Sequence, residues 1–179
     1  MKGPWLLRWQ DPYVGSRWMQ GAVYALLAAV LLWGLLGALE EAKEQAENLT
    51  VSLLIRNIRT GMQWAMAEKM LQGKEHEIAG WVGSNPVFFL GTTPRGYIGE
   101  CGSAGACEMA DGEWCFDRQR GELAYQPQGR KFLRIEQSAE VCNRPPLRWR
   151  LGQAAKSVAN DGMVGLRVEI VTPYTWLME

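Results

Sequence analysis

The stretch GAVYALLAAVLLWGLLGAL, residues 21–39, holds nineteen consecutive uncharged and mostly apolar residues. A helix of this length, at about 1.5 Å per residue, just crosses the ~30 Å hydrocarbon core of a bilayer. A core helix of a soluble protein would normally interrupt such a run with polar residues. We therefore predict a single transmembrane helix over residues 21–39.

A cleaved signal peptide is the alternative interpretation of this segment. Signal peptides have an apolar region of about 7–15 residues that ends in small residues at a cleavage site. The run found here is longer and passes directly into EEAKEQAE, residues 40–47. An uncleaved anchor is favoured for this reason.

The charges on either side of the anchor predict its orientation. Residues 1–20 carry Lys2, Arg8 and Arg17 against a single acidic residue, Asp11, whereas acidic residues dominate the other flank. Because lysine and arginine accumulate on the cytoplasmic side of a span, residues 1–20 are expected in the cytoplasm. In a bacterium this predicts a single-pass inner-membrane protein whose C-terminal domain lies in the periplasm.

Composition predicts one small folded domain and excludes a nucleic-acid surface. The chain has 179 residues, a formal net charge of zero and a sequence pI of about 6.6. Nucleic-acid binding needs a concentrated basic excess, which this balance does not provide. Residues 74–179 suffice for one modest hydrophobic core, so we expect a single α+β head there.

Residues 40–73 are predicted to continue the anchor as an amphipathic helix. Between Glu40 and Gln72 there is no proline and one glycine, Gly61. Apolar residues recur at three- and four-residue intervals, as on one helix face; they are Val51, Leu54, Ile55, Ile58, Met62, Ala65, Met66 and Met70. One helix from Gly21 to Gln72 is therefore expected, ended by Gly73.

This apolar face has two interpretations. It can form the side of the helix that packs against the head, or it can contact a helix of another subunit. The second interpretation fits the part nearer the membrane, with Ala42, Ala46 and Leu49. Both can hold along different parts of the helix.

The four cysteines, Cys101, Cys107, Cys115 and Cys142, all follow the anchor and lie in the predicted disulfide-permissive compartment. Structural zinc sites usually contain a C-x(2–4)-C pair, which is absent, so two disulfides are favoured over zinc. Three connectivities are possible. The preferred one joins Cys101 to Cys107 and Cys115 to Cys142.

The head is predicted to combine irregular loops with an antiparallel sheet. Residues 74–113 are rich in glycine, proline, serine and threonine, which favours loops. Short connections without room for crossover helices indicate antiparallel pairing, and Gly121 is expected at a turn. Strands are expected at 113–117, 122–127, 130–137, 147–153 and 165–172.

Two stretches resemble type IV pilin-like and pseudopilin-like proteins. The stretch NPVFFLGTTPRGYIGE, residues 85–100, resembles the loop after the long helix of that family, and GEWCFDRQRGELAYQP, residues 112–127, resembles its hairpin. Within the family the resemblance is greatest to the MshF accessory proteins of mannose-sensitive haemagglutinin (MSHA) pilus biogenesis. It implies a long N-terminal helix packed on a small antiparallel sheet.

The N-terminus departs from the pattern of that family. Pilins have a cleavage glycine followed by a hydrophobic stretch with glutamate at its fifth position, whereas Gly15 is followed by SRWMQ and Gln20 replaces the glutamate. Arg17 is also unfavourable in a segment that must enter the bilayer. The resemblance then implies an accessory or minor subunit in assembly of a type IV (MSHA-like) pilus or a type II secretion pseudopilus.

Catalytic patterns are not found in the sequence. The one histidine, His76, lies in a polar KEHE turn and is expected to be solvent-exposed. The glycine-rich GECGSAGAC lacks the lysine and Ser/Thr of a phosphate-binding loop, and C-x-x-C is missing. We predict no enzyme activity, no cofactor, no metal and no small-molecule substrate.

The predicted partners are the membrane and other pilin-like or pilus-assembly subunits. Acidic residues gather over 100–117, and basic ones over 130–150, so the two runs can be solvated faces or complementary patches between subunits. The loop from Cys101 to Cys107 is a further candidate contact. The residues proposed for partner binding are Leu26, Leu27, Val30, Leu35, Arg148 and Arg150.

Two other functions remain as alternatives. One is a bitopic inner-membrane scaffold of the same machinery with a ferredoxin-like periplasmic head, which needs a second helix between strands, at residues 152–163. The other is a membrane-tethered sensing domain, which needs a deep apolar pocket in the head.

Overall fold

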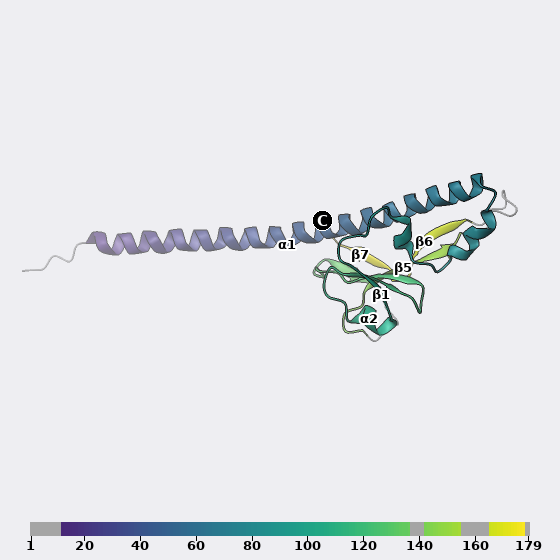
Figure 1. The fold of residues 1–179 in the computed structure, drawn as a ribbon. Coiled ribbons are helices and arrows are strands. Elements are labelled where there is room, and N and C mark those ends of the chain that lie inside the picture. Colours follow the sequence, from purple (N-terminus) through teal and green to yellow (C-terminus); the bar gives the residue numbers. More distant parts are fainter. Residues whose placement is uncertain (1–11, 137–141, 155–164, 178–179) are drawn as a thin grey trace, which may run out of the picture. The chain divides into compact units, whose positions relative to one another are not determined.

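The computed structural model describes residues 12–136, 142–154 and 165–177 (Figure 1). The chain divides into two compact units, Met1–Ala42 and Lys43–Glu179. Helix α1, Pro12–Leu71, contributes to both. Proline suits a first helical position because the N–H that it lacks would have no partner inside the helix.

The end of α1 is a glycine cap. The N–H of Gly73 donates to the carbonyl of Met70 at 3.1 Å, and the N–H of Lys74 donates to the carbonyl of Lys69 at 2.9 Å. Gly73 has a φ of +68°, a conformation that glycine adopts without steric cost. The predicted end of the helix is confirmed, whereas its start lies before the predicted Gly21.

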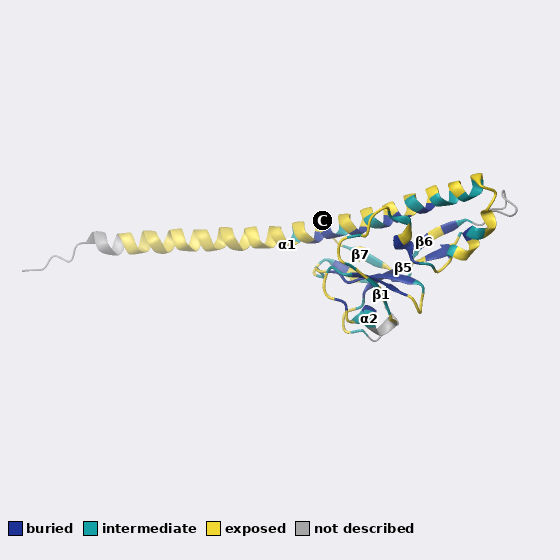
Figure 2. Ribbon diagram, in the orientation of Figure 1, coloured by how far each residue is buried: buried dark blue, intermediate teal, exposed yellow. Residues whose placement is uncertain are grey.

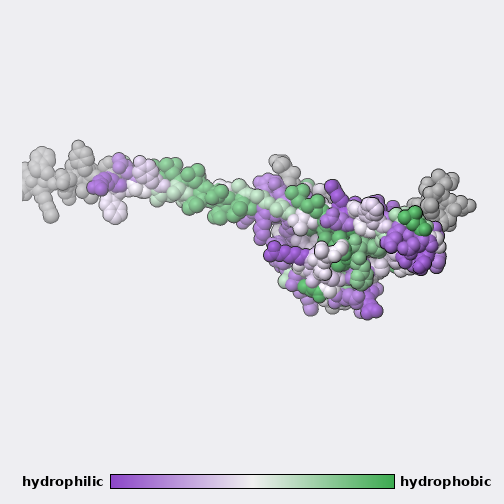
Figure 3. Space-filling view, turned by 45° about the horizontal axis from the view of Figure 1, so that its top comes forward, coloured by the Kyte–Doolittle hydropathy of each residue, from purple (hydrophilic) through white to green (hydrophobic). Residues whose placement is uncertain are grey.

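In the first unit, every described side chain of α1 from Arg17 to Glu40 is exposed. The most apolar eighteen-residue window has a mean hydropathy of 2.3, and none of it is buried. Figure 3 shows these hydrophobic side chains following one another along the helix. By length and composition α1 is therefore able to cross a membrane.

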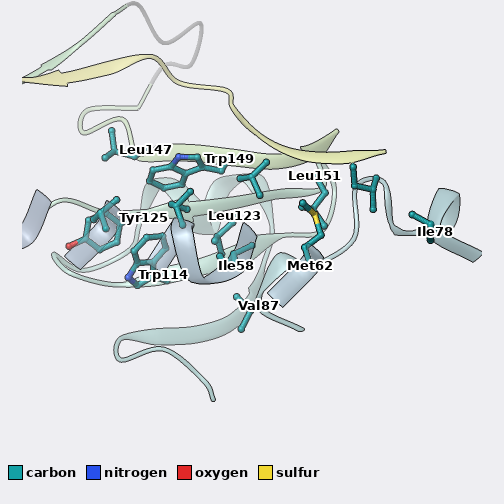
Figure 4. Packing of buried hydrophobic residues seen from close by; sticks show 14 of the residues in the cluster. Ile58, Met62, Ile78, Val87, Trp114, Leu123, Tyr125, Leu147, Trp149 and Leu151 are labelled. Atoms are coloured by element: carbon teal, nitrogen blue, oxygen red, sulfur yellow. The ribbon is translucent and has the colours of Figure 1, made fainter. Parts of the chain in front are cut away.

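In the second unit, one side of α1 is buried and the other is exposed (Figure 2). The buried side carries Val51, Ile55, Ile58 and Met62, each at most 5% exposed. Figure 4 shows Ile58 and Met62 among the buried residues of the sheet. The predicted apolar face of the helix is thereby confirmed as part of the core.

Among the described residues, five strands form one sheet in the order β1-β2-β3-β5-β6. Two more strands, β4 and β7, form a separate antiparallel pair. The strands are β1 Tyr97–Cys101, β2 Trp114–Asp117, β3 Glu122–Tyr125, β4 Leu133–Ile135, β5 Leu147–Gln153, β6 Leu166–Ile170 and β7 Tyr174–Trp176. Together with α1 they form the predicted α+β arrangement.

Aromatic rings from three neighbouring strands fill the centre of the sheet's buried face. The ring of Trp114 lies 4.3 Å from that of Tyr125 and 5.6 Å from that of Trp149, measured between centroids. The register brings them together, because Trp114 is opposite Tyr125 on β3, and Leu123 of the same strand is opposite Trp149. Large rings at such distances contribute beyond the area they bury.

One pairing contradicts the prediction of a wholly antiparallel sheet, because β1 and β2 are parallel. The predicted loop over residues 74–113 in fact contains β1, the short helix α2 (Ser103–Cys107) and two 3-10 helices, η1 (Glu75–Trp81) and η2 (Pro86–Phe89). Residues 102–113 between β1 and β2 are long enough for a parallel connection. Gly99, at φ +99° where the register shifts, interrupts the strand pattern of β1.

The segment 152–163, predicted as a possible second helix, is only partly described. Gly152 and Gln153 end β5 and pair with Arg167 and Leu166 of the antiparallel neighbour β6. A helix in a ferredoxin-like head would instead join two parallel strands. Residues 155–164 lie outside the described residues.

Candidate interaction site

The apolar part of α1 in the first unit is the first candidate surface. Leu26, Leu27, Val30 and Leu35 are 52–66% exposed. At 3.6 residues per turn, Leu26 and Leu35 point to opposite sides of the helix, so these four do not form one face. A helix that is apolar on all sides is suited to lipid or to partner helices around it.

A pair of buried carboxylates connects α1 to the loop after β3. Glu47 accepts hydrogen bonds from the Tyr125 hydroxyl at 2.7 Å, the Gln128 N–H at 2.7 Å and the Gly129 N–H at 3.0 Å. Glu44, one helical turn earlier, accepts the N–H groups of residues 131 and 132, both at 3.0 Å. We call Glu44 and Glu47 the carboxylate clamp.

The carboxylate clamp is closed to solvent and tightly packed. Glu44 is 5% exposed and Glu47 is 9% exposed. A Cβ atom added to Gly129 would lie 2.2 Å from the Cγ atom of Glu44, so a larger residue there would displace the Glu44 side chain. Burial, together with the hydrogen bond to Glu47, raises the pKa of Tyr125 far above its ordinary value and keeps its hydroxyl a donor.

A second buried ionic cluster lies on the other side of the sheet from the core. Arg148 is 3% exposed, and its Nη1 atom lies 3.3 Å from Asp117 and 3.4 Å from Glu122. Asp117 also accepts the N–H of Gln119 at 3.0 Å and so shapes the turn between β2 and β3. Arg148, which was predicted to bind a partner, is therefore buried and paired with carboxylates inside the domain.

The other predicted charge contacts are exposed but pair within the chain. Arg150 lies 3.2 Å from Glu169, and Arg144 lies 2.9 Å from Asp111. Hydrogen bonds from Arg167 and Arg150 lower the pKa of Glu169. Since Asp111 belongs to the acidic run and Arg144 to the basic run, the two runs meet in part inside one molecule.

The cysteines form two disulfides, but not the preferred pairs. Cys101 is bonded to Cys115, and Cys107 is bonded to Cys142. Cys101 and Cys115 lie on neighbouring parallel strands, with Cα atoms 5.8 Å apart. The preferred pairing was wrong because the parallel strand β1 was not foreseen, and with it the closeness of these two cysteines.

The disulfides enclose a small second core next to α2. Ala106, Met109, Cys115 and Ala124 are buried together, with Cys101 packed against them. The candidate contact loop from Cys101 to Cys107 is therefore the end of β1 followed by α2. Within it, Ala106 is fully buried and supports the fold.

A surface groove that sequence reasoning missed lies between α1 and η2. It has a volume of about 570 Å³ and is lined by Gly61, Trp64, Ala65, Ala67, Glu68, Leu71, Phe88 and Phe89. Trp64, Leu71 and Phe88 are 74–90% exposed. The available signal was the position of Trp64 and Leu71 away from the predicted buried face of the helix.

His76 is exposed in η1, as predicted.

Comparison with protein-family models, with curated proteins and with solved structures found no match for this chain.

Proposed function

We propose that this chain is a membrane-anchored pilin-like accessory or minor subunit in assembly of a type IV (MSHA-like) pilus or a type II secretion pseudopilus. The observation that carries this proposal is the change of character along α1. Its N-terminal part is apolar and exposed on all sides, and its C-terminal part has one face buried under a mostly antiparallel sheet. The resemblance of residues 85–100 and 112–127 to that family adds support.

The proposed mechanism is recognition rather than catalysis. The apolar part of α1 holds the protein in the inner membrane with residues 43–179 in the periplasm. The carboxylate clamp then fixes the head to the helix, because it joins Glu44 and Glu47 to the Tyr125 hydroxyl of β3 and to four N–H groups of the loop after β3, about 80 residues later. Other pilin-like subunits contact Leu26, Leu27, Val30 and Leu35 within the bilayer.

Membrane topology provides the first test. The full-length chain with a C-terminal tag is expected to stay in the membrane pellet after alkaline extraction. Protease added to spheroplasts should remove the tag, whereas a tag at the N-terminus should be protected until the inner membrane is opened. A chain recovered in the soluble fraction, or a protected C-terminal tag, would contradict the proposal.

Photocrosslinking in cells of the source organism tests the assembly role. A photoreactive amino acid at Val30 is expected to give products that contain pilin-like subunits identified by mass spectrometry. The same amino acid at His76, which is exposed on the head and outside the proposed bilayer contact, serves as the control. Products at Val30 that contain lipid alone would contradict a subunit role.

Intact mass under non-reducing conditions tests the accessory assignment. Retention of residues 1–15 is expected, since Gln20 occupies the place of the family's glutamate. A mass that begins after Gly15 would instead indicate a processed filament subunit. The same measurement reports the hydrogens lost in the two disulfides.

A further inference from the structure

The side of α1 opposite the core carries its own apolar stripe in the second unit. Its members recur at three-, four- and seven-residue intervals, which places them on one face of a helix. We call them the outer stripe: Ala46, Leu49, Leu53, Thr60, Trp64, Ala67 and Leu71, all exposed. The hydroxyl of Thr60 donates to the carbonyl of Arg56 at 3.1 Å and so uses its polar group within the helix.

The outer stripe is not explained by burial against the head or by lipid. Leu49 is 63% exposed, Leu53 is 53% exposed and Trp64 is 74% exposed. Apart from Ala46, the stripe lies beyond the charged segment 40–47, which the bilayer interior would not accommodate. Apolar side chains gathered on one face in this way mark an interaction surface.

We propose that the outer stripe binds the outer stripe of a second copy of this chain, with the two α1 helices parallel. In a parallel pair each residue lies near its own counterpart, so a charged residue in the stripe would oppose a like charge. All seven members are uncharged, and Arg56, between Leu53 and Thr60, lies at the edge of the stripe. The parallel direction follows from the proposed anchor, because two copies inserted in one membrane point the same way.

The groove beside the stripe adds shape complementarity of the kind a twofold contact needs. A twofold interface uses the same patch on both molecules, so that patch must contain both a projection and a hollow. Here Trp64 and Phe88 project from the surface, and Gly61 and Ala65 form part of the floor between them. The hollow, of about 570 Å³, offers space for an aromatic ring of the second copy.

The floor of this groove is held in shape by Gly61. A Cβ atom at this position would lie 2.0 Å from the carbonyl oxygen of Phe89, so the glycine lets η2 approach α1 closely. The rings of Trp81 and Phe89, with centroids 5.2 Å apart, pack behind it. The groove is therefore preformed in the single chain and needs little rearrangement to bind.

Cysteine crosslinking in native membranes tests the proposal. The full chain with Leu53→Cys, treated with a short bismaleimide, is expected to give a product of twice the mass of the 20.1 kDa chain. Ser52→Cys is the matched control, because it is exposed at the same height but lies off the stripe. Equal yields of the doubled product at the two positions would overturn the proposal.

A second substitution separates a specific contact from random collision. Trp64→Arg added to Leu53→Cys is expected to abolish the doubled product, and since Trp64 is 74% exposed, far-UV circular dichroism should remain unchanged. A doubled product that survives Trp64→Arg would overturn the role of the groove. A product containing another protein in place of the second copy would overturn the choice of occupant.

The same membranes distinguish this proposal from the proposed function. If the chain pellets with membranes and the Leu53→Cys product is missing, the self-contact is wrong and the anchor stands. If the chain is soluble, the anchor is wrong, and with it the argument for parallel helices. A doubled product without pilin-like subunits at Val30 would support the self-contact and contradict the assembly role.

Discussion

Glu44 and Glu47 differ most from what their place in the sequence indicates. They belong to the acidic segment that follows the anchor, where charged residues normally face water. In the folded domain both are buried and accept hydrogen bonds from the backbone of residues 128–132. Their donors lie about 80 residues later, so no local pattern could reveal the carboxylate clamp.

Glu47→Gln is expected to destabilise the second unit. The amide nitrogen that replaces one carboxylate oxygen cannot accept a hydrogen bond, which leaves at least one of three buried donors without its partner. Such a loss costs about 1–3 kcal/mol of unfolding free energy. Denaturant unfolding of the full chain in detergent, followed by tryptophan fluorescence, measures it. Glu75→Gln, at an exposed carboxylate, should change stability by less than about 0.5 kcal/mol.

Stability is expected to fall above about pH 10 because of Tyr125. Its pKa is raised in the folded state, so the unfolded chain releases the proton first. The contribution is complete below the unfolded pKa of about 10 and is lost as the pH rises above it. Unfolding of the full chain between pH 8 and pH 11, compared with Tyr125→Phe, measures the effect. A fall of the same slope in Tyr125→Phe would contradict this assignment.

At the scale of elements, the strand pair β1 and β2 contrasts with the helix α1. The pairing of β1 depends on residues far away in the chain, whereas α1 follows from its own local sequence. β1 is a short strand interrupted by Gly99, and its pairing depends on the crossover through α2. That pairing brings Cys101 next to Cys115. The helix α1, by contrast, is long and strongly periodic, and its predicted end and buried face are both confirmed.

Non-reducing peptide mapping is expected to recover one peptide pair with Cys101 and Cys115 and another with Cys107 and Cys142. Replacing both members of a pair by serine should destabilise the domain through the unfolded chain. For bridges that span 14 and 35 residues, loop closure gives about 3 and about 4 kcal/mol respectively. A peptide pair that joins Cys101 to Cys107 would contradict the pairing. An equal loss of unfolding free energy in both double variants would contradict the ranking of the two bridges.

Gly61→Ala is expected to destabilise the contact between α1 and η2. Alanine favours a helix by up to about 1 kcal/mol, but its Cβ atom would collide with the Phe89 carbonyl, and such overpacking costs about 1–3 kcal/mol. The carbonyl belongs to the backbone and cannot move aside easily. Thermal unfolding of the full chain should therefore show a lower midpoint. Gly34→Ala, which meets nothing within 4 Å, is the helical control and should not lower it.

At the scale of the whole molecule, the chain consists of two units that suit different surroundings, lipid for the first and water for the second. The described side chains of the first unit leave their apolar surface exposed, and the second unit buries its own in a core with α1 on one side of the sheet. An apolar surface exposed on all sides of a helix is stable in lipid and not in water. The first unit is thus expected to hold the protein in the membrane, and the second to provide the surface that partner subunits bind.

Val30→Arg is expected to reduce membrane insertion of the whole chain. Val30 lies near the middle of residues 21–39, where an arginine costs about 2.5–3.5 kcal/mol or more. The fraction of protein that resists alkaline extraction measures this effect, with Val30→Leu as the control of similar hydropathy. An unchanged membrane fraction for Val30→Arg would contradict a span over these residues.

The sequence by itself determined the features that depend on nearby residues. Helix periodicity and the lack of proline predict α1 up to its cap at Gly73, and alternation predicts β5, because both signals lie within one element. It also indicated that the four cysteines form disulfides, since their spacing suits no zinc pair.

Only the tertiary structure decided what depends on residues far apart in the chain. Four features depend on contacts between segments that only folding brings together. They are the disulfide pairing, the parallel pairing of β1, the carboxylate clamp and the burial of Arg148. Arg148 shows the reason most clearly. Alternation along β5 places it opposite the core-facing residues, as for an exposed residue, but Asp117 of β2 and Glu122 of β3 pair with it there and neutralise its charge.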